Sequence, residues 1–261
     1  MLNDLIEEAS QNIENLDLDS KNYYELDGEV IVSAHKTNKV YVKDLECIKY
    51  IKKIIFSPNA QNAKIYLGRA FKGSTSINIQ QSNSIVYIGN TCNLREVDIR
   101  TQALGSCIFI GNGITTTGNN SWLTGSFPGS KFSSIIIGDD CLFSNDITIR
   151  GSDGHPIMTF DFKEQINAPR KNIVIEPYVW IGQGVKILKS IRVGSASIIG
   201  TSTVITKDIP KFSKAYGFPV TFKDIGGIWI KDRREVSVET AKKYLLKHGK
   251  QANTSCLEET S

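Results

Sequence analysis

The sequence of 261 residues contains no apolar run approaching about 18 residues, the length at which a bilayer-spanning helix becomes a candidate. Its first residues, MLNDLIEEASQNIENL, are acidic and lack the basic start and apolar core of a secretory signal. The five cysteines are scattered and form no CxxC pair, so neither a disulfide framework nor a zinc site is indicated. These absences predict a cytoplasmic protein with reduced, structural thiols.

Strong charge and nucleotide-binding motifs are also missing. The net charge of +4 permits an anionic ligand but does not require one. No basic run with interleaved aromatic residues occurs, which argues against nucleic acid as a partner. The sequence has neither a Walker motif nor GxGxxG, so P-loop and Rossmann folds are not expected.

The C-terminal half does contain an aliphatic residue at every sixth position. The series is Ile175, Ile181, Ile187, Val193, Ile199 and Ile205. A period of six matches neither a helix nor a single strand, and it indicates a solenoid of short strands that turn a corner after each one. Glycine follows the aliphatic residue at positions 182, 194 and 200, where a small residue suits a tight corner. We expect the aliphatic side chains to point inward and stack as ladders.

The same period sets the expected domain boundaries. A less regular form of the six-residue repeat begins at Ile88, Leu94 and Ile110. The regular six-residue spacing returns at Ile137, Phe143 and Ile149. The period fails in two stretches, which we interpret as excursion loops. The expected divisions are an N-terminal cap region (1–64), a repeat domain (65–225) with excursion loops 117–134 and 150–172, and a C-terminal helix with a flexible tail (226–261).

Several segments of the repeat resemble the hexapeptide-repeat acyltransferases. They are VWIGQGVKIL, IRVGSASIIGTSTVITKDIP and YGFP. Within that group, IRGSDGHPI and INAPRKNIVIEPYVWIG are most similar to bacterial sugar O-acetyltransferases that act on capsular polysaccharide, O-antigen or related glycans. The resemblance is strong over 135–225, fainter over 65–134 and absent at both ends. It implies an all-β, left-handed parallel β-helix, acetyl-CoA as acyl donor without a metal, and a homotrimer with active sites between neighbouring subunits.

His155 is the strongest catalytic candidate, because it lies in the excursion loop that leaves the repeat. A sugar hydroxyl is a poor nucleophile at neutral pH, and an imidazole within hydrogen-bond reach can remove its proton as it attacks the thioester. The alternative is a surface histidine that stabilises its own loop. Asp153 can orient the imidazole or can simply open the turn, and Asp161 and Glu164 are competing partners.

The resemblance suggests roles for other residues. Trp180 of the VWIG motif would lie beside the histidine loop of a neighbouring subunit, where it shapes the acyl site or packs the interface. Asn145 would face the acceptor. From its own chemistry, Arg150 could hold a carboxylate or phosphate on the acceptor, because its planar fork suits such groups, although an exposed arginine is usually only solvated. Contacts to acetyl-CoA would fall on Gln183, Thr201, Thr206 and Lys207. The related enzymes often carry a basic residue two positions after the GxP proline, and here Thr221 occupies that position, so Lys223 is the candidate substitute.

Three rival functions compete with sugar O-acetylation. A zinc hydratase like the γ-class carbonic anhydrases needs three imidazoles on one metal, and of His35, His155 and His248 only His155 lies in the repeat. A non-catalytic repeat protein and an N-acetyltransferase acting on an amino-sugar nucleotide both stay open. The sequence favours an acetyl-CoA-dependent O-acetyltransferase acting on a sugar hydroxyl of a bacterial surface polysaccharide.

Overall fold

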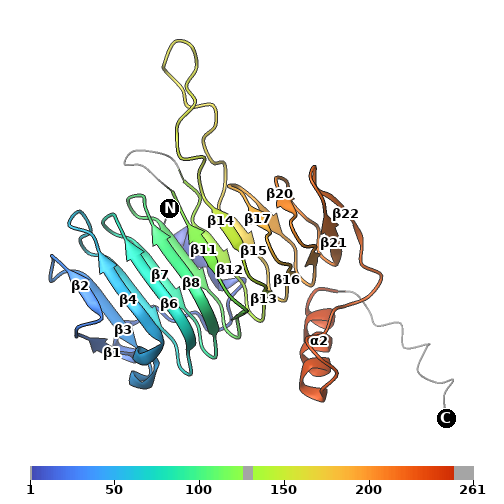
Figure 1. The fold of residues 1–261 in the computed structure, drawn as a ribbon, viewed down its shortest axis with the longest axis horizontal. Helices are drawn as coiled ribbons and strands as arrows, with labels where there is room; N and C mark the ends of the chain where they lie inside the picture. The colour runs from blue at the N-terminus through green and yellow to red at the C-terminus, as the bar shows by residue number, and fades with distance from the viewer. Residues whose placement is uncertain (1, 126–131, 250–261) are drawn as a thin grey trace.

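The structure, a computed structural model, describes residues 2–125 and 132–249. The chain winds into a solenoid of three-sided coils. The strands of successive coils stack in rows, and these rows run along the long axis of the molecule (Figure 1). Apart from the two antiparallel pairs β1–β3 and β21–β22, every named strand pairing is parallel. The all-β solenoid with a short C-terminal helix, expected from the six-residue period, is confirmed.

Each coil contributes one strand to each of three faces. The first face holds β1 (Tyr24–Leu26), β3 (Lys39–Val42), β5 (Lys64–Leu67), β7 (Ile85–Ile88), β9 (Cys107–Ile110), β12 (Ile135–Ile137), β15 (Ile173–Ile175) and β18 (Arg192–Val193). The second face holds β10 (Thr115–Thr116), β13 (Leu142–Phe143), β16 (Trp180–Ile181), β19 (Ile198–Ile199) and the hairpin β21 (Ser213–Tyr216) and β22 (Thr221–Asp224). The third face holds β2 (Ile31–Ser33), β4 (Ile51–Phe56), β11 (Asn120–Leu123), β14 (Ile147–Arg150), β17 (Lys186–Ile187) and β20 (Val204–Ile205).

Two long strands, β6 (Lys72–Ile79) and β8 (Asn93–Thr101), run through both the second and the third face. The start of β8 pairs with β10 and its later part pairs with β11. We call the bend between the second and third faces the second corner, and the bend between the third and first faces the third corner. In the later coils, separate short strands replace the long ones on either side of the second corner.

The aliphatic ladder lies inside the solenoid as expected. All six members of the series from Ile175 to Ile205 are fully buried. Strand pairing stacks Ile149 on Ile187 and Ile187 on Ile205, and the other two faces repeat this arrangement. Each inward side chain therefore contacts its counterparts one coil above and below, which is the source of the core.

The corners depend on two positions in each hexad. The residue three after the inward aliphatic adopts a positive φ, as at Tyr178 (63°) and Ser202 (58°), which turns the chain by a left-handed residue. The glycine directly after the aliphatic residue is required for a different reason. A Cβ added to Gly194 would lie 2.4 Å from the backbone nitrogen of Lys211 in the next coil, so glycine is needed because the coils approach closely.

The earlier coils differ from the expectation in two respects. Parallel pairing already begins with β2 and β4 and with β3 and β5, before residue 65. Residues 120–123, interpreted from the sequence as part of an excursion loop, instead form β11 between β8 and β14. Trp122 of β11 is fully buried in the solenoid core. Part of the first excursion, residues 126–131, lies outside the described residues.

Segments from both ends of the chain cover the solenoid. Helix α1 (Leu2–Ser10) buries Leu5 and Ala9 against the outer side of the first face, where they pack in one cluster with Tyr66 and Phe109. The 3₁₀ helices η1 (Ser20–Asn22) and η2 (Leu45–Tyr50) connect the first coils. At the other end, α2 (Glu235–Lys247) packs Tyr244 on Tyr178, with ring centroids 4.7 Å apart.

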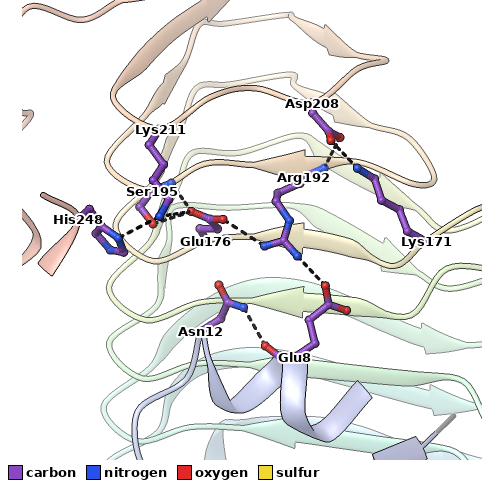
Figure 2. Close-up of polar contacts among 9 residues, drawn as sticks. All are labelled: Glu8, Asn12, Lys171, Glu176, Arg192, Ser195, Asp208, Lys211 and His248. Carbon is purple, nitrogen blue, oxygen red and sulfur yellow. Dashed lines mark hydrogen bonds and ion pairs between the residues drawn. The ribbon is translucent and has the colours of Figure 1, made fainter. Parts of the chain in front are cut away.

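A buried carboxylate joins the N-terminal helix to the last coils (Figure 2). Glu176 accepts hydrogen bonds from the backbone N–H and the hydroxyl of Ser195, at 3.0 and 2.9 Å. It also forms an ion pair with Arg192 at 3.1 Å. The second guanidinium nitrogen of Arg192 reaches Glu8 of α1 at 2.6 Å. Burial alone would raise the pKa of Glu176, but these partners outweigh it and hold the pKa below its ordinary value.

The network continues to the end of α2. Lys211 lies 3.8 Å from Glu176 and 3.4 Å from Nδ1 of His248, the C-cap residue of α2. Burial, followed by the charge of Lys211, lowers the pKa of His248. One set of polar contacts therefore links the helix at each end of the chain to the solenoid.

We expect acid to destabilise the protein through this network. The stabilisation from Glu176 is complete above its ordinary pKa of 4.5 and is lost as the pH falls through the lowered folded-state pKa. The unfolded state also gains protons at His248 below about pH 6.5, while the folded state resists protonation. A Glu176→Gln variant should lose roughly 1–3 kcal/mol of unfolding free energy at pH 7, because its ion pairs are removed.

Thermal or urea unfolding between pH 3 and 8 measures both effects, and the Glu176→Gln variant should also show a weaker dependence below about pH 5. Glu164→Gln, an exposed change on the 150–172 loop, is the matched control and should follow the parent curve. An identical pH profile in the parent and the Glu176→Gln variant would contradict the role assigned to this carboxylate.

Candidate functional site

The loop that carries His155 projects from the third corner, between β14 and β15 (Figure 1). Both of its ends are fastened to the coils. The N–H of Ser133 donates to the carbonyl of Gly151 at 2.7 Å, and the hydroxyl of Ser133 donates to the carbonyl of Lys171 at 2.6 Å. At the far end, the hydroxyl of Ser190 accepts from the N–H of Arg170 at 2.7 Å. The loop therefore leaves the solenoid from a fixed base.

Backbone contacts inside the loop position His155. Asn167 donates to the carbonyl of His155 and to the carboxylate of Asp153, both at 2.9 Å, and accepts from the N–H of Ile157 at 2.8 Å. Asp153 also pairs with Lys189 from the neighbouring coil. The side chain of His155 is exposed. Asn167 and Lys189 therefore hold the segment that presents the imidazole, and neither was singled out from the sequence.

The competing acidic residues have other contacts. Asp161 accepts from the hydroxyl of Thr159 at 2.5 Å and pairs with Lys163 at 3.4 Å, both within the tip of the loop. Glu164 is exposed, and its backbone carbonyl accepts from the N–H of Thr159 at 2.8 Å. Both residues contribute to the hairpin shape of the tip, which includes a bridge between Met158 and Gln165.

Trp180 lies on another part of the coil. It is the first residue of β16 on the second face, 38% exposed, with its ring centroid 6.1 Å from that of Trp229. Trp229 is buried and stacks on Tyr178 at 4.3 Å, and its indole N–H donates to the carbonyl of Tyr178 at 3.0 Å. The C-terminal segment thus supports one side of Trp180 and leaves the other side accessible.

Three predicted residues stand in one column along the second corner. The carbonyl of Asn145 accepts from the N–H of Gly184 at 3.0 Å, and the carbonyl of Gln183 accepts from the N–H of Ser202 at 2.7 Å. Asn145, Gln183 and Thr201 therefore occupy successive coils. Asp146 joins the first two, because its carboxylate accepts from Asn145 at 3.2 Å and from Gln183 at 3.5 Å.

Asp146 was missed by the sequence analysis. A signal was present, since Asp146 lies three residues after the inward Phe143, at the position that adopts the left-handed conformation (φ 59°). A search for the aliphatic residue of each hexad does not detect this polar side chain. The position places a carboxylate at the second corner beside Asn145.

The other predicted residues follow the third corner. Arg150 ends β14 and is exposed, and Thr206 follows β20 in the same row of strands two coils later. The ammonium of Lys207 lies 5.4 Å from the ring of Phe222 on β22. In that hairpin Lys214 and Lys223 stand directly opposite each other, and Thr221 opposes Tyr216. The predicted residues therefore form two groups, one on the second face and second corner, which includes Trp180 and the residues of β22, and one at the third corner.

Comparison with known proteins adds relatives to this geometry. No family model matches the chain. It is 32% identical to the polysialic acid O-acetyltransferase of Escherichia coli O1:K1 / APEC over 116 residues, and 35% identical to the galactoside O-acetyltransferase of Lactococcus lactis over 89 residues. The crystal structure of the polySia-specific acetyltransferase NeuO superposes with a TM-score of 0.61 at 25% identity, over 85% of this chain and 91% of that one.

The chain is thus similar to O-acetyltransferases over part of its length, and its fold matches that of the acetyltransferase NeuO. The alignments to the two curated relatives cover 44% and 34% of this chain, and 38% and 42% of the relatives' own lengths. The chain thus spans less than half of either protein in these alignments. The resemblance expected from the VWIG and SDGHPI motifs is confirmed as a similarity to O-acetyltransferases, and the parallel β-helix fold is confirmed.

Other features of the chain bear on rival chemistries. Cys47, Cys92, Cys107 and Cys141 are buried free thiols, and burial raises the pKa of Cys92 and Cys107 to about 12, so neither thiol is activated. Cys256 lies outside the described residues. Within residues 2–125 and 132–249, no group of three His, Cys, Asp or Glu side chains is arranged to hold a metal ion. In the same part of the chain, neither helix has the length and apolar character needed to cross a membrane.

Proposed function

We propose that the protein is an acetyl-CoA-dependent O-acetyltransferase that modifies a sugar hydroxyl of a bacterial surface polysaccharide, acting as a cytoplasmic homotrimer. The single observation that carries this proposal is the projecting loop that presents His155 from a fixed base on an acyltransferase solenoid. The relatives named as polysialic acid and galactoside O-acetyltransferases support oxygen on a saccharide as the acceptor.

The proposed assembly between subunits is supported by where the candidate groups lie. His155 and Arg150 belong to the third corner, whereas Trp180, Asn145 and Gln183 belong to the second face and second corner. A loop from one protomer can complete the second-corner site of its neighbour. The loop also exposes an apolar surface that a neighbour would cover, made by Ile157, Phe160, Phe162 and Ile166.

The proposed reaction is direct acyl transfer in a ternary complex. The imidazole of His155 accepts the proton of the sugar hydroxyl as its oxygen attacks the thioester carbonyl, and the C–S bond breaks as the tetrahedral intermediate collapses. The proton then passes to the departing thiolate. Asp153 supports the loop through Asn167 and Lys189, and its proposed role is to stabilise the imidazolium, while Trp180 would shape the acyl site from the neighbouring subunit.

The residues present fit acetyl-CoA as the donor. Gln183 and Thr201 offer exposed polar side chains on successive coils, along which an extended pantetheine arm can lie. Lys214 and Lys223 form a basic cluster on the hairpin one coil beyond Thr201, where the nucleotide end would follow, and Lys207 contacts Phe222 of the same hairpin. Two like charges directly opposite each other on a hairpin repel, so an anion between them would relieve a cost of the empty protein. This cluster can replace the basic residue missing at Thr221.

We therefore expect opposite effects on binding and stability from Lys223→Gln. The KM for acetyl-CoA should rise roughly fivefold to tenfold, because a phosphate contact is lost. The free energy of unfolding without ligand should stay equal or rise by a few tenths of a kcal/mol, because the repulsion with Lys214 ends. Steady-state kinetics and urea unfolding test the two parts. A Lys242→Gln variant on α2 is the control, and an unchanged KM for acetyl-CoA in Lys223→Gln would contradict the assignment.

The experiment that tests the proposed function is acetyl transfer from acetyl-CoA to a panel of glycans. The panel should contain acidic and neutral polysaccharides, their short oligosaccharides and an amino-sugar nucleotide, with the product position fixed by NMR. O-acetylated polysaccharide is the expected product. Acetylation of the amino-sugar nucleotide alone would favour N-acetyl transfer, and no transfer to any acceptor would favour a non-catalytic repeat protein.

A further inference from the structure

We propose that the second corner of the earlier coils is a docking groove for an extended acidic polysaccharide, which holds sugar units of the acceptor beyond the unit that reacts. The proposal rests on the proposed function in one respect only, namely that the polymer bound in the groove is the acceptor. It adds a binding site in residues 50–118, a region to which neither the motifs nor the suggested roles assign a function.

The groove is continuous with the column that contains Asn145. A Cβ added to Gly118 would lie 3.2 Å from Cβ of Asn145, and the N–H of Asp146 donates to the carbonyl of Asn119 at 2.6 Å. One coil further from Asn145, the N–H of Arg95 donates to the hydroxyl of Thr116 at 2.7 Å. With coils about 4.8 Å apart, Arg95 lies roughly 10 Å along the corner from Asn145 and Lys72 roughly 15 Å.

The corner is hollow over these coils. A groove of about 570 Å³ is lined by Tyr50, Lys72, Gly73, Ser74, Asn93, Arg95, Glu96, Thr117 and Gly118. The hollow has a local cause in the backbone. The pairing of β6 with β8 shifts register between Ser74 and Thr75, so that Glu96 is an extra residue with φ at 50°. Gly73 adopts φ at 121° with the carbonyl of Leu94 directly behind it, which leaves no room for a side chain.

The lining suits an acidic glycan. Neither Lys72 nor Arg95 forms an ion pair within the described residues, so both cations are available to carboxylates. The hydroxyls and amide of Ser74, Asn93 and Thr117 can bond to sugar hydroxyls, and Tyr50 offers an aromatic edge. Glu96 is the one acid in the lining, which leaves an excess of positive charge.

The length of the column selects a polymer over a single sugar. A ligand that reaches Lys72 while its reacting unit lies at Asn145 must extend across three coil spacings, roughly 15 Å, which one sugar ring cannot do. An extended chain lying along the corner would contact Arg95 and then Lys72. The structure therefore links acceptor length to two cations that are far from the acyl donor.

The test compares the parent with a Lys72→Gln, Arg95→Gln double variant. The KM for an acidic polysaccharide should rise about tenfold, because two exposed charge contacts of roughly 0.7 kcal/mol each are lost. The kcat, the KM for acetyl-CoA and the rate on a mono- or disaccharide acceptor should not change. The parent should also lose affinity for the polymer as salt rises, and the double variant should lose less.

A binding measurement separates this proposal from the proposed function. Calorimetric titration of the full protein with a polysaccharide of carboxylated sugars, and with a neutral polysaccharide, needs no acetyl-CoA. Binding of the acidic polymer alone, weakened in the double variant, supports the groove even if no acetyl transfer occurs. The matched control is Lys64→Gln, Arg69→Gln, which removes an exposed lysine at the start of β5 and an exposed arginine two residues after its end. Equal affinity of the parent and the groove variant for the acidic polymer would overturn the proposal.

Discussion

Replacing His155 with alanine should lower kcat by roughly 10²–10⁴-fold and leave the assembly and acetyl-CoA binding intact. A sugar hydroxyl is almost entirely protonated at neutral pH, so attack on the thioester depends on a base that removes its proton. Alanine cannot accept that proton. The loss should therefore fall on the chemical step and not on the binding of either substrate.

The loop itself should survive this change. Asn167 bonds to the backbone carbonyl of His155, and Asp153 is held by Lys189, so neither contact needs the imidazole. Pre-steady-state acetyl transfer, with calorimetric titration of acetyl-CoA, separates chemistry from binding. His35→Ala, a change at a half-buried histidine in the first coils, is the control. Near-parental turnover in His155→Ala would remove the mechanism.

The six-residue period predicted the later coils well because one residue in six decides the core. Ile181, Ile187 and Val193 each stack on the equivalent residue of the next coil, so the signal repeats with the structure. The same reasoning failed at β11. The segment around Trp122 is rich in Gly, Asn, Ser and Thr and carries no period, yet its parallel neighbours β8 and β14 supply the hydrogen bonds and the core that make it a strand. Pairing partners 20 or more residues away leave no local signal.

The candidate site likewise contains residues that the sequence reveals and residues that it does not. The motifs around His155 and Trp180 were visible because they interrupt or mark the repeat. Asp146 and Asn167 were not, since each acts through a contact with a residue on another coil or across the loop. The groove at Lys72 and Arg95 depends on a one-residue register shift between β6 and β8, which the sequence alone does not reveal.

An Ile187→Asp substitution should prevent folding. Ile187 is fully buried in the row that stacks Ile149, Ile187 and Ile205, and no polar partner lies in that row. The aspartate would leave a cavity and a carboxylate without a hydrogen-bond donor, at a cost of at least about 4–5 kcal/mol. That cost is comparable with the whole stability of many domains, roughly 5–15 kcal/mol.

The neighbouring residue provides the control for this prediction. Lys186 lies on the same strand, is exposed and points to the other side of the sheet. Lys186→Asp adds an aspartate one residue away and should change the free energy of unfolding by no more than about 0.5 kcal/mol. Circular dichroism, size exclusion and urea unfolding of the two variants measure the difference. A folded Ile187→Asp protein with the parental unfolding midpoint would show that the aliphatic ladder does not form the core, and the site built on its corners would then lose its foundation.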